Sequence, residues 1–263
     1  MTCVTTITLN GHPTWAHLPK RRGRTIVFLH GGASSSASML NSIGPPLDKY
    51  FRIAAFDRRG HGRTADTDAP FSYEAMADET IAFLEMLDRR VHLLGHSDGG
   101  NVALLVAIRR PDLLRRVVAI GANYHHEGLM AMAIRENQSD EFVEWTVKFG
   151  ALSPDGPEHA AVVAEKTRLM YQTGPSINVS DLATIPVPVL VMAGDDDVAT
   201  LAHTCSMYEA IPQGQLSIVP GTSHQILKEK TEESVAIIHD FLTGEVPPIT
   251  CMPIRRLTTD VID

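Results

Sequence analysis

The sequence contains little that would cross-link the chain, carry it through a membrane or hold a metal. Its three cysteines, Cys3, Cys205 and Cys251, lie far apart and form no C-x-x-C motif. We therefore expect neither a disulfide framework nor a thiolate metal site, and such sparse cysteine is typical of a reducing compartment. The first residues lack a basic segment followed by an apolar one, which argues against a signal peptide. Because no apolar run approaches the length of a membrane-spanning helix, the sequence predicts a cytoplasmic protein with no membrane partner.

Positive charge is scarce as well. The 23 lysines and arginines stand against 31 aspartates and glutamates, which gives a net charge of −8. Because polyanions repel an acidic protein, nucleic acid is excluded as the main partner. The one tight basic cluster, residues 20–24, is expected to be a solvated turn. With 263 residues the chain has room for one large α/β domain or two small ones, as a monomer or a homodimer.

Short apolar runs alternate with helical patterns along most of the chain. The runs cover residues 4–9, 14–18, 25–29, 52–56, 91–94, 117–120, 187–193 and 216–219, and the helical patterns cover 72–87, 101–110, 202–210 and 232–242. Asn10-Gly11 separates the first two runs and predicts a hairpin. The later alternation predicts a mostly parallel sheet with helices on both faces.

One interval of about sixty residues interrupts this alternation. Residues 123–183 carry helical patterns at 129–135, 140–149 and 157–173 but no clear strand. They predict a helical lid over the carboxyl edge of the sheet, inserted into a discontinuous core of residues 1–122 and 184–263. The side chains of this insertion that we expect to contact substrate are Tyr124, His125, His126, Met130, Met132, Trp145 and Tyr171. The tail from Gly244 is expected to be irregular.

The most informative segment is Gly95-His96-Ser97-Asp98-Gly99, which stands between an apolar run and a helical pattern. Strand, G-x-S-x-G and helix in this order form the pattern of a nucleophile elbow. A serine on such a sharp turn takes a positive φ and presents its hydroxyl above the sheet. The residues two before and two after it approach each other, so both need to lack a β-carbon, as Gly95 and Gly99 do. The sequence therefore predicts Ser97 as a nucleophile.

A serine nucleophile needs a base that takes its proton and an acid that orients the base. In the order serine, acid, histidine, both partners lie downstream of Ser97. Among the 12 histidines, His224 is the expected base because it ends the loop 220–224 between the last apolar run and the last helical pattern. His203 and His239 lie inside helical patterns, where a packed or solvated role is expected.

The acid is expected directly after the apolar run 187–193, where Asp195, Asp196 and Asp197 follow one another. The chain must turn at Gly194 before a side chain can reach His224. We therefore favour Asp197 and place Asp195 second. Glu127, which follows the preceding strand, is a further alternative.

Two N–H donors are needed for the oxyanion of a tetrahedral intermediate. One is expected from Asp98, directly after the nucleophile. The other is expected from Gly32 in the loop that follows residues 25–29, where Gly31 and Gly32 let the backbone approach substrate.

These motifs together resemble the α/β-hydrolase superfamily. The resemblance covers nearly the whole chain and is carried by His30-Gly31-Gly32, residues 57–64, Gly95 to Gly100, Gly194 to Asp197 and Pro220 to His224. It implies the α/β-hydrolase fold, with an eight-stranded, mostly parallel sheet and an inserted helical lid. It also implies that residues 57–64 form a structural loop. Haloalkane dehalogenases and epoxide hydrolases are excluded, because they carry aspartate where this chain has Ser97.

The residues and the resemblance predict a serine hydrolase, without cofactor or metal, that cleaves a small carboxylic ester or lactone. Ser97, His224 and Asp197 would form the triad, and Gly32 and Asp98 the oxyanion hole. Three alternatives use the same constellation: a carbon–carbon bond hydrolase, a perhydrolase of the non-haem haloperoxidase sort, and a ligand sensor with slow turnover. Fold and triad do not choose among them.

Asp98 bears on the substrate, since the Ser-Asp-Gly-Gly sequence is similar to that of valacyclovir hydrolases. In those enzymes the aspartate after the nucleophile pairs with an α-amino group of the substrate. The resemblance thus implies a carboxylate at the cavity rim that favours neutral or cationic acyl groups. The alternative is that Asp98 complements the dipole at the N-terminus of a helix.

Overall fold

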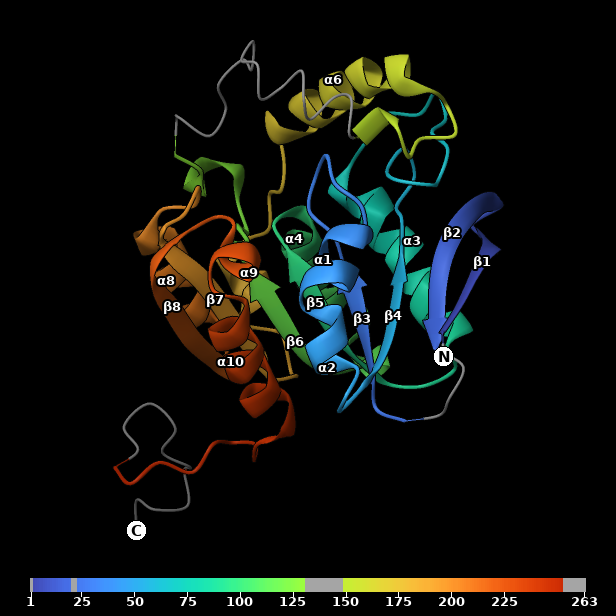
Figure 1. Ribbon diagram of the computed structural model, residues 1–263. Coiled ribbons are helices and arrows are strands. Elements are labelled where there is room, and N and C mark those ends of the chain that lie inside the picture. The colour runs from blue at the N-terminus through green and yellow to red at the C-terminus, as the bar shows by residue number, and fades with distance from the viewer. Residues whose placement is uncertain (1, 20–22, 131–148, 253–263) are drawn as a thin grey trace.

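The computed structural model describes residues 2–19, 23–130 and 149–252. Its strands form one eight-stranded sheet in the order β1-β2-β4-β3-β5-β6-β7-β8. β1 (Thr2–Leu9) pairs with β2 (His12–Pro19) and β2 with β4 in antiparallel fashion, and the other pairs are parallel. Figure 1 shows the twisted sheet, with the β1–β2 hairpin at one end and β8 at the other. The predicted α/β-hydrolase architecture is confirmed.

The remaining strands occupy the apolar runs of the sequence. They are β3 (Thr25–Leu29), β4 (Arg52–Phe56), β5 (Val91–His96), β6 (Leu114–Ile120), β7 (Val189–Asp196) and β8 (Gly214–Ser223). Every residue of β3 is buried, as expected for a strand covered on both faces. β8 is longer than the run 216–219 because its partly polar ends also pair with β7. The predicted hairpin is present, with Asn10 and Gly11 both at positive φ.

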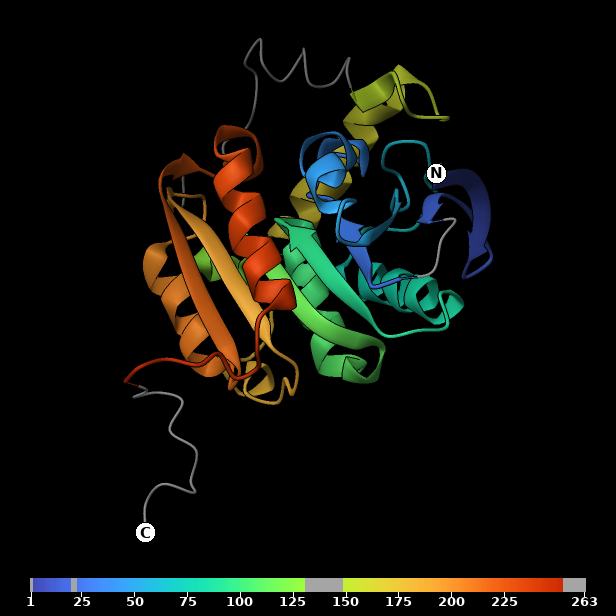
Figure 2. The same ribbon diagram turned by 60° about the horizontal axis from the view of Figure 1, so that its bottom comes forward.

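Helices cover both faces of the sheet (Figure 2). The helices α3 (Tyr73–Met86), α4 (Asp98–Arg109) and α8 (Leu201–Ala210) contribute to one apolar layer. The opposite layer includes α1 (Ala37–Ser42), α2 (Gly44–Leu47), α9 (Ile226–Glu229) and α10 (Thr231–Thr243). The sequence did not predict α1, α2 or α9, because four to six residues are too few to show a helical period. Within the described residues, no helix is long and apolar enough to cross a membrane.

Between β6 and β7, the described residues contain the 3₁₀ helices η2 (His126–Gly128) and η4 (Pro157–His159), and the helices α6 (Ala160–Tyr171) and α7 (Val179–Leu182). α6 lies beyond the carboxyl ends of β3 and β4 (Figure 1). Leu129 and Met130 are not helical, contrary to the predicted start of a helix at 129. Most of the predicted helices 129–135 and 140–149 lies outside the described residues.

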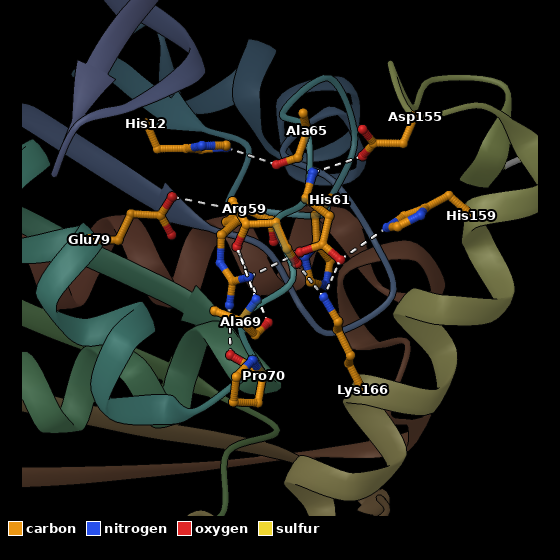
Figure 3. A network of polar contacts seen from close by, with 12 residues as sticks. His12, Arg59, His61, Ala65, Ala69, Pro70, Glu79, Asp155, His159 and Lys166 are labelled. Atoms are coloured by element: carbon orange, nitrogen blue, oxygen red, sulfur yellow. Dashed lines mark hydrogen bonds and ion pairs between the residues drawn. The ribbon is translucent and has the colours of Figure 1, made fainter.

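A polar network ties the segment between β6 and β7 to the loop that follows β4 (Figure 3). Lys166 and His159 both contact Asp66 Oδ2, at 2.7 and 3.0 Å. Arg59 donates to Asp66 Oδ1 at 3.1 Å, and the backbone N–H of Asp66 donates to Asp155. Burial alone would raise the pKa of Asp66, but the hydrogen bonds from Lys166 and His159 hold it below its usual value. An ionised Asp66 thus links α6 to the core.

Candidate active site

Ser97 lies between the end of β5 and the start of α4, with φ 55° and ψ −123°. This positive φ is the strained conformation that the elbow pattern predicts. A β-carbon on Gly95 would overlap the backbone of Gly99, and one on Gly99 would overlap the backbone of Leu29. The turn therefore needs both glycines, and Ser97 lines a cavity at the carboxyl edge of the sheet.

The structure brings His224 and Asp197 together from the ends of β8 and β7. Nδ1 of His224 donates to Oδ1 of Asp197 at 2.6 Å, which leaves Nε2 as the proton acceptor of a neutral ring. The backbone N–H groups of Val198 and Gly194 also donate to Asp197. Burial would raise the pKa of Asp197, but these hydrogen bonds, His224 first among them, hold it below its usual value. An ionised acid therefore orients His224, which lines the same cavity as Ser97.

The other candidate acids lie elsewhere. Asp195 accepts a hydrogen bond from the backbone N–H of Thr222, and Asp196 is exposed. The side chain of Glu127 is 81% exposed and lies 3.6 Å from His125. Of the four carboxylates considered, Asp197 is the one that contacts His224.

Sequence reasoning missed a contribution from His96. Its Nε2 donates to the backbone carbonyl of His224 at 2.8 Å, and the two rings lie 4.8 Å apart. Burial and the neighbouring His224 lower the pKa of His96 to about 4, so the ring is neutral. His96 therefore joins the end of β5 to the histidine loop. The one sequence signal for this role was the position of His96 between Gly95 and the candidate nucleophile Ser97.

The loop after β3 is held by a second histidine and by Arg58. Nδ1 of His30 donates to the carbonyl of Gly31 at 2.7 Å, and its Nε2 accepts from the backbone N–H of Arg58. Arg58 is 1% exposed, and its Nη2 also donates to Gly31 at 3.0 Å. A β-carbon on Gly32 would overlap Oδ2 of Asp98. The two residues expected to supply the oxyanion donors, Gly32 and Asp98, therefore lie next to each other in space. Nothing in the pattern of the 57–64 loop distinguishes Arg58 from a solvated arginine.

The carboxylate of Asp98 is engaged inside the protein. It is 3% exposed, and its oxygens accept hydrogen bonds from Tyr73 at 2.8 Å and from Tyr171 of α6 at 3.1 Å. Burial raises the pKa of Asp98, an effect that Arg58 and the two tyrosines only partly offset. The expected position at an open cavity rim is therefore not what the structure shows. The sequence could not reveal this, because Tyr73 and Tyr171 lie 98 positions apart.

The predicted substrate contacts fall into separate places. Gly31, Gly32, Ser97 and His224 line one cavity. Tyr124 and His125 line a different one beside α7 and α8, where Tyr124 stacks on His203 at 4.0 Å. Isolated bridges pair His125 with Ser176 and Leu129 with Ala199, which holds this segment against residues near α7 and α8.

The remaining side chains predicted to contact substrate also lie in different parts of the structure. Met130 is 45% exposed, and Tyr171 reaches Asp98. His126 is the first residue of η2, and His125 directly precedes it. Met132 and Trp145 lie outside the described residues.

A serine with positive φ, a histidine oriented by an ionised aspartate and a glycine-lined loop are the parts of an acyl-transfer site. No group of three or more histidine, cysteine or carboxylate side chains suited to a metal occurs within the described residues.

Comparison with known proteins agrees with this geometry. The sequence model of the alpha/beta hydrolase family matches residues 26–232. The chain belongs to this family. It is 27% identical over 247 residues to a Caulobacter protein that carries the provisional name carbamate hydrolase RutD, with 84% of this chain and 92% of that protein covered.

Two further relatives are informative. The chain is 25% identical over 254 residues to the 2-hydroxy-6-oxo-6-(2'-aminophenyl)hexa-2,4-dienoic acid hydrolase of Metapseudomonas resinovorans, covering 86% of this chain and 87% of that one. A crystal structure of a serine hydrolase involved in carbazole degradation superimposes with a TM-score of 0.75 at 20% identity, covering 92% and 99% of the two chains. The names support the hydrolase class, and the superposition shows the fold.

Proposed function

We propose that this protein is a serine hydrolase that cleaves a carboxylic ester or lactone through an acyl-enzyme on Ser97. The observation that carries the proposal is the 2.6 Å hydrogen bond from His224 to Asp197 beside a serine at φ 55°. The histidine is thereby fixed in the tautomer that can accept the proton of Ser97. Membership in a hydrolase family supports the same class of reaction.

In the first step, Oγ of Ser97 attacks the carbonyl carbon while its proton passes to Nε2 of His224. The N–H groups of Gly32 and Asp98 stabilise the oxyanion. Collapse of the intermediate breaks the ester bond, and the leaving alkoxide takes the proton from His224. Water then attacks the acyl-enzyme, giving one proton to His224, and Ser97 recovers that proton as the carboxylic acid departs.

The insertion acts as a lid in this proposal. α6 places Tyr171 against Asp98, directly behind the expected oxyanion hole. A cover in this position would exclude water from the acyl-enzyme and contact the substrate.

Labelling with a fluorophosphonate tests the proposal. The wild-type protein should be labelled and should hydrolyse p-nitrophenyl acetate with many turnovers, and Ser97→Ala should lose both. Ser206→Ala is a matched control, because Ser206 lines the second cavity and bonds to Tyr124. Labelling that persists in Ser97→Ala would overturn the proposal.

A carbon–carbon bond hydrolase is the second candidate, favoured by the Metapseudomonas relative. The substrate in that relative's name is an oxo acid that contains no ester linkage. The two candidates are distinguished by turnover of a vinylogous 1,5-diketone against a matched ester. Faster turnover of the diketone would favour the second candidate.

A further inference from the structure

The cavity at Ser97 continues between α1 and α9, beyond the catalytic groups. Its volume is about 280 Å³, and the residues at this end are Ser34, Ser38, Ser42, Gln225 and Lys228. The apolar side chains of Met39 and Leu227 also line this end, so its hydroxyl, amide and ammonium groups are polar groups placed among apolar walls. A polar end of this kind is suited to a polar part of the substrate.

The charge at this end of the cavity has one sign. Lys228 is the one lysine or arginine among the described lining residues, and none of them is an aspartate or glutamate. The adjacent carboxylate, Glu229, is committed to the backbone N–H and the hydroxyl of Ser223, both at 2.7 Å. The local charge therefore opposes the net charge of −8 of the whole chain.

The ammonium group of Lys228 is uncommitted: it makes no hydrogen bond or ion pair with another described residue. The same holds for the side-chain amide of Gln225. The serines differ, since Ser34 donates to Ser38, Ser38 to a backbone carbonyl and Ser42 to another. Lys228 and Gln225 are thus the side chains with free N–H donors at this end.

Lys228 lies close enough to the catalytic groups for its charge to reach them. After burial and His224, Lys228 is one of the causes that lower the pKa of His96, which directly precedes Ser97. Because Lys228 and Ser97 line the same cavity, one ligand can contact both residues.

We propose that Lys228, with Gln225, binds a carboxylate of the substrate. The substrate class is then an ester or lactone that also carries a free carboxylate, separate from the bond that is cleaved. This inference rests on the proposed ester hydrolysis at Ser97. A charge-assisted N–H···O bond to the ammonium group supplies the attraction. Asp98 does not oppose it, because its carboxylate is enclosed by Tyr73 and Tyr171 with Arg58 nearby.

The test compares p-nitrophenyl hydrogen adipate with its methyl ester, which has the same chain but no charge. The ratio of kcat/KM for the acid to that for the methyl ester isolates the contribution of the carboxylate. We expect Lys228→Gln to lower this ratio by about 3- to 5-fold, as for an exposed ion pair. Lys228→Glu should lower it further, because it adds a like charge.

Lys230→Gln is the matched control. Lys230 lies two residues further on, is absent from the cavity lining and donates to the carbonyl of Pro220. Its variant should keep the wild-type ratio. An unchanged ratio in both Lys228 variants would overturn the inference, as would an equal loss for both esters.

Binding separates this inference from the proposed reaction. Calorimetry with Ser97→Ala should show tighter binding of the adipate half-ester than of its methyl ester, and Ser97→Ala/Lys228→Gln should abolish the difference. If the wild-type protein hydrolysed neither ester, the proposed function would fail, and this binding difference would still support or overturn the carboxylate site.

Discussion

Two buried aspartates flank the candidate nucleophile, and their pKa values move in opposite directions. Asp197 is 6% exposed and Asp98 is 3% exposed, so burial raises the pKa of both. Asp197 accepts from an imidazole that can carry positive charge and from two backbone N–H groups, and its pKa is lowered overall. Asp98 accepts from two tyrosine hydroxyls, and its pKa stays raised. The direction of each pKa shift follows from the balance between burial, which raises both pKa values, and the hydrogen-bond partners, which outweigh burial only at Asp197.

The largest expected effect comes from Asp197→Asn. His224 would lose the acceptor that fixes its tautomer, so kcat for an activated ester should fall by about 10³–10⁴-fold. Asp195→Asn is the matched control, because Asp195 bonds to the backbone of Thr222 and does not contact His224. If kcat collapsed in Glu127→Gln and not in Asp197→Asn, the acid of the triad would be Glu127, which follows β6, and not Asp197, which follows β7.

Gly32→Ala should disturb the Asp98 side of the nucleophile by a smaller factor. The added β-carbon would overlap Oδ2 of Asp98 and the hydroxyl of Tyr171, so the loop must shift. Loss of one oxyanion donor corresponds to about 10²–10³-fold in kcat. Gly44→Ala serves as the control, since its nearest new contact is an ordinary 3.5 Å. A normal kcat in Gly32→Ala would show that Gly32 is not a donor.

Tyr73→Phe removes one of the two hydroxyl donors that hold Asp98. Leaving a buried acceptor without a partner costs about 1–3 kcal/mol, and we expect a loss of that order in the free energy of unfolding. Denaturation in urea at neutral pH measures it. Tyr50→Phe, at an exposed tyrosine, should be neutral. If Tyr73→Phe were equally neutral, the tyrosine would contribute nothing to holding the carboxylate.

The opposite pKa directions predict opposite pH dependences of stability. The folded pKa of Asp98 lies above the unfolded value of about 3.9, so its ionisation costs stability as the pH rises through that window. The folded pKa of Asp197 lies below that value, so its contribution is present above about pH 4 and is lost as the pH falls.

Urea denaturation of Asp98→Asn and Asp197→Asn between pH 3 and pH 7 measures both slopes. Relative to wild type, Asp98→Asn should gain stability as the pH rises. Asp197→Asn should gain it as the pH falls. Slopes of the same sign for the two variants would contradict the comparison.

The smallest expected effect concerns amine recognition by Asp98. Because both of its oxygens accept from tyrosines, Asp98→Asn should leave the ratio of kcat/KM for an α-amino acid ester to that for its des-amino analogue unchanged. A ratio that fell in the variant would show that Asp98 pairs with an ammonium group, as the similarity to valacyclovir hydrolases implies.

Local rules were enough to predict much of the fold and the candidate nucleophile. The apolar runs predicted the strands because a strand covered on both faces tolerates few polar side chains. Ser97 followed from the two glycines that its turn requires, and His224 and Asp197 followed from their places at the ends of strands. The short helices were not predicted, because α2 and α9 have four residues each and show no helical period in the sequence.

The sequence by itself determined the order of strands and helices, the turn that presents Ser97, and the short set of acids and bases from which a triad could be drawn. Only the tertiary structure brought Asp197, the acid that the sequence favoured, into contact with His224, joined His96 to the histidine loop and enclosed Asp98 between Tyr73 and Tyr171. The reason is physical: turns and buried strands depend on neighbours along the chain. The charge of a buried carboxylate and the lining of a cavity depend instead on side chains that folding brings together from distant positions.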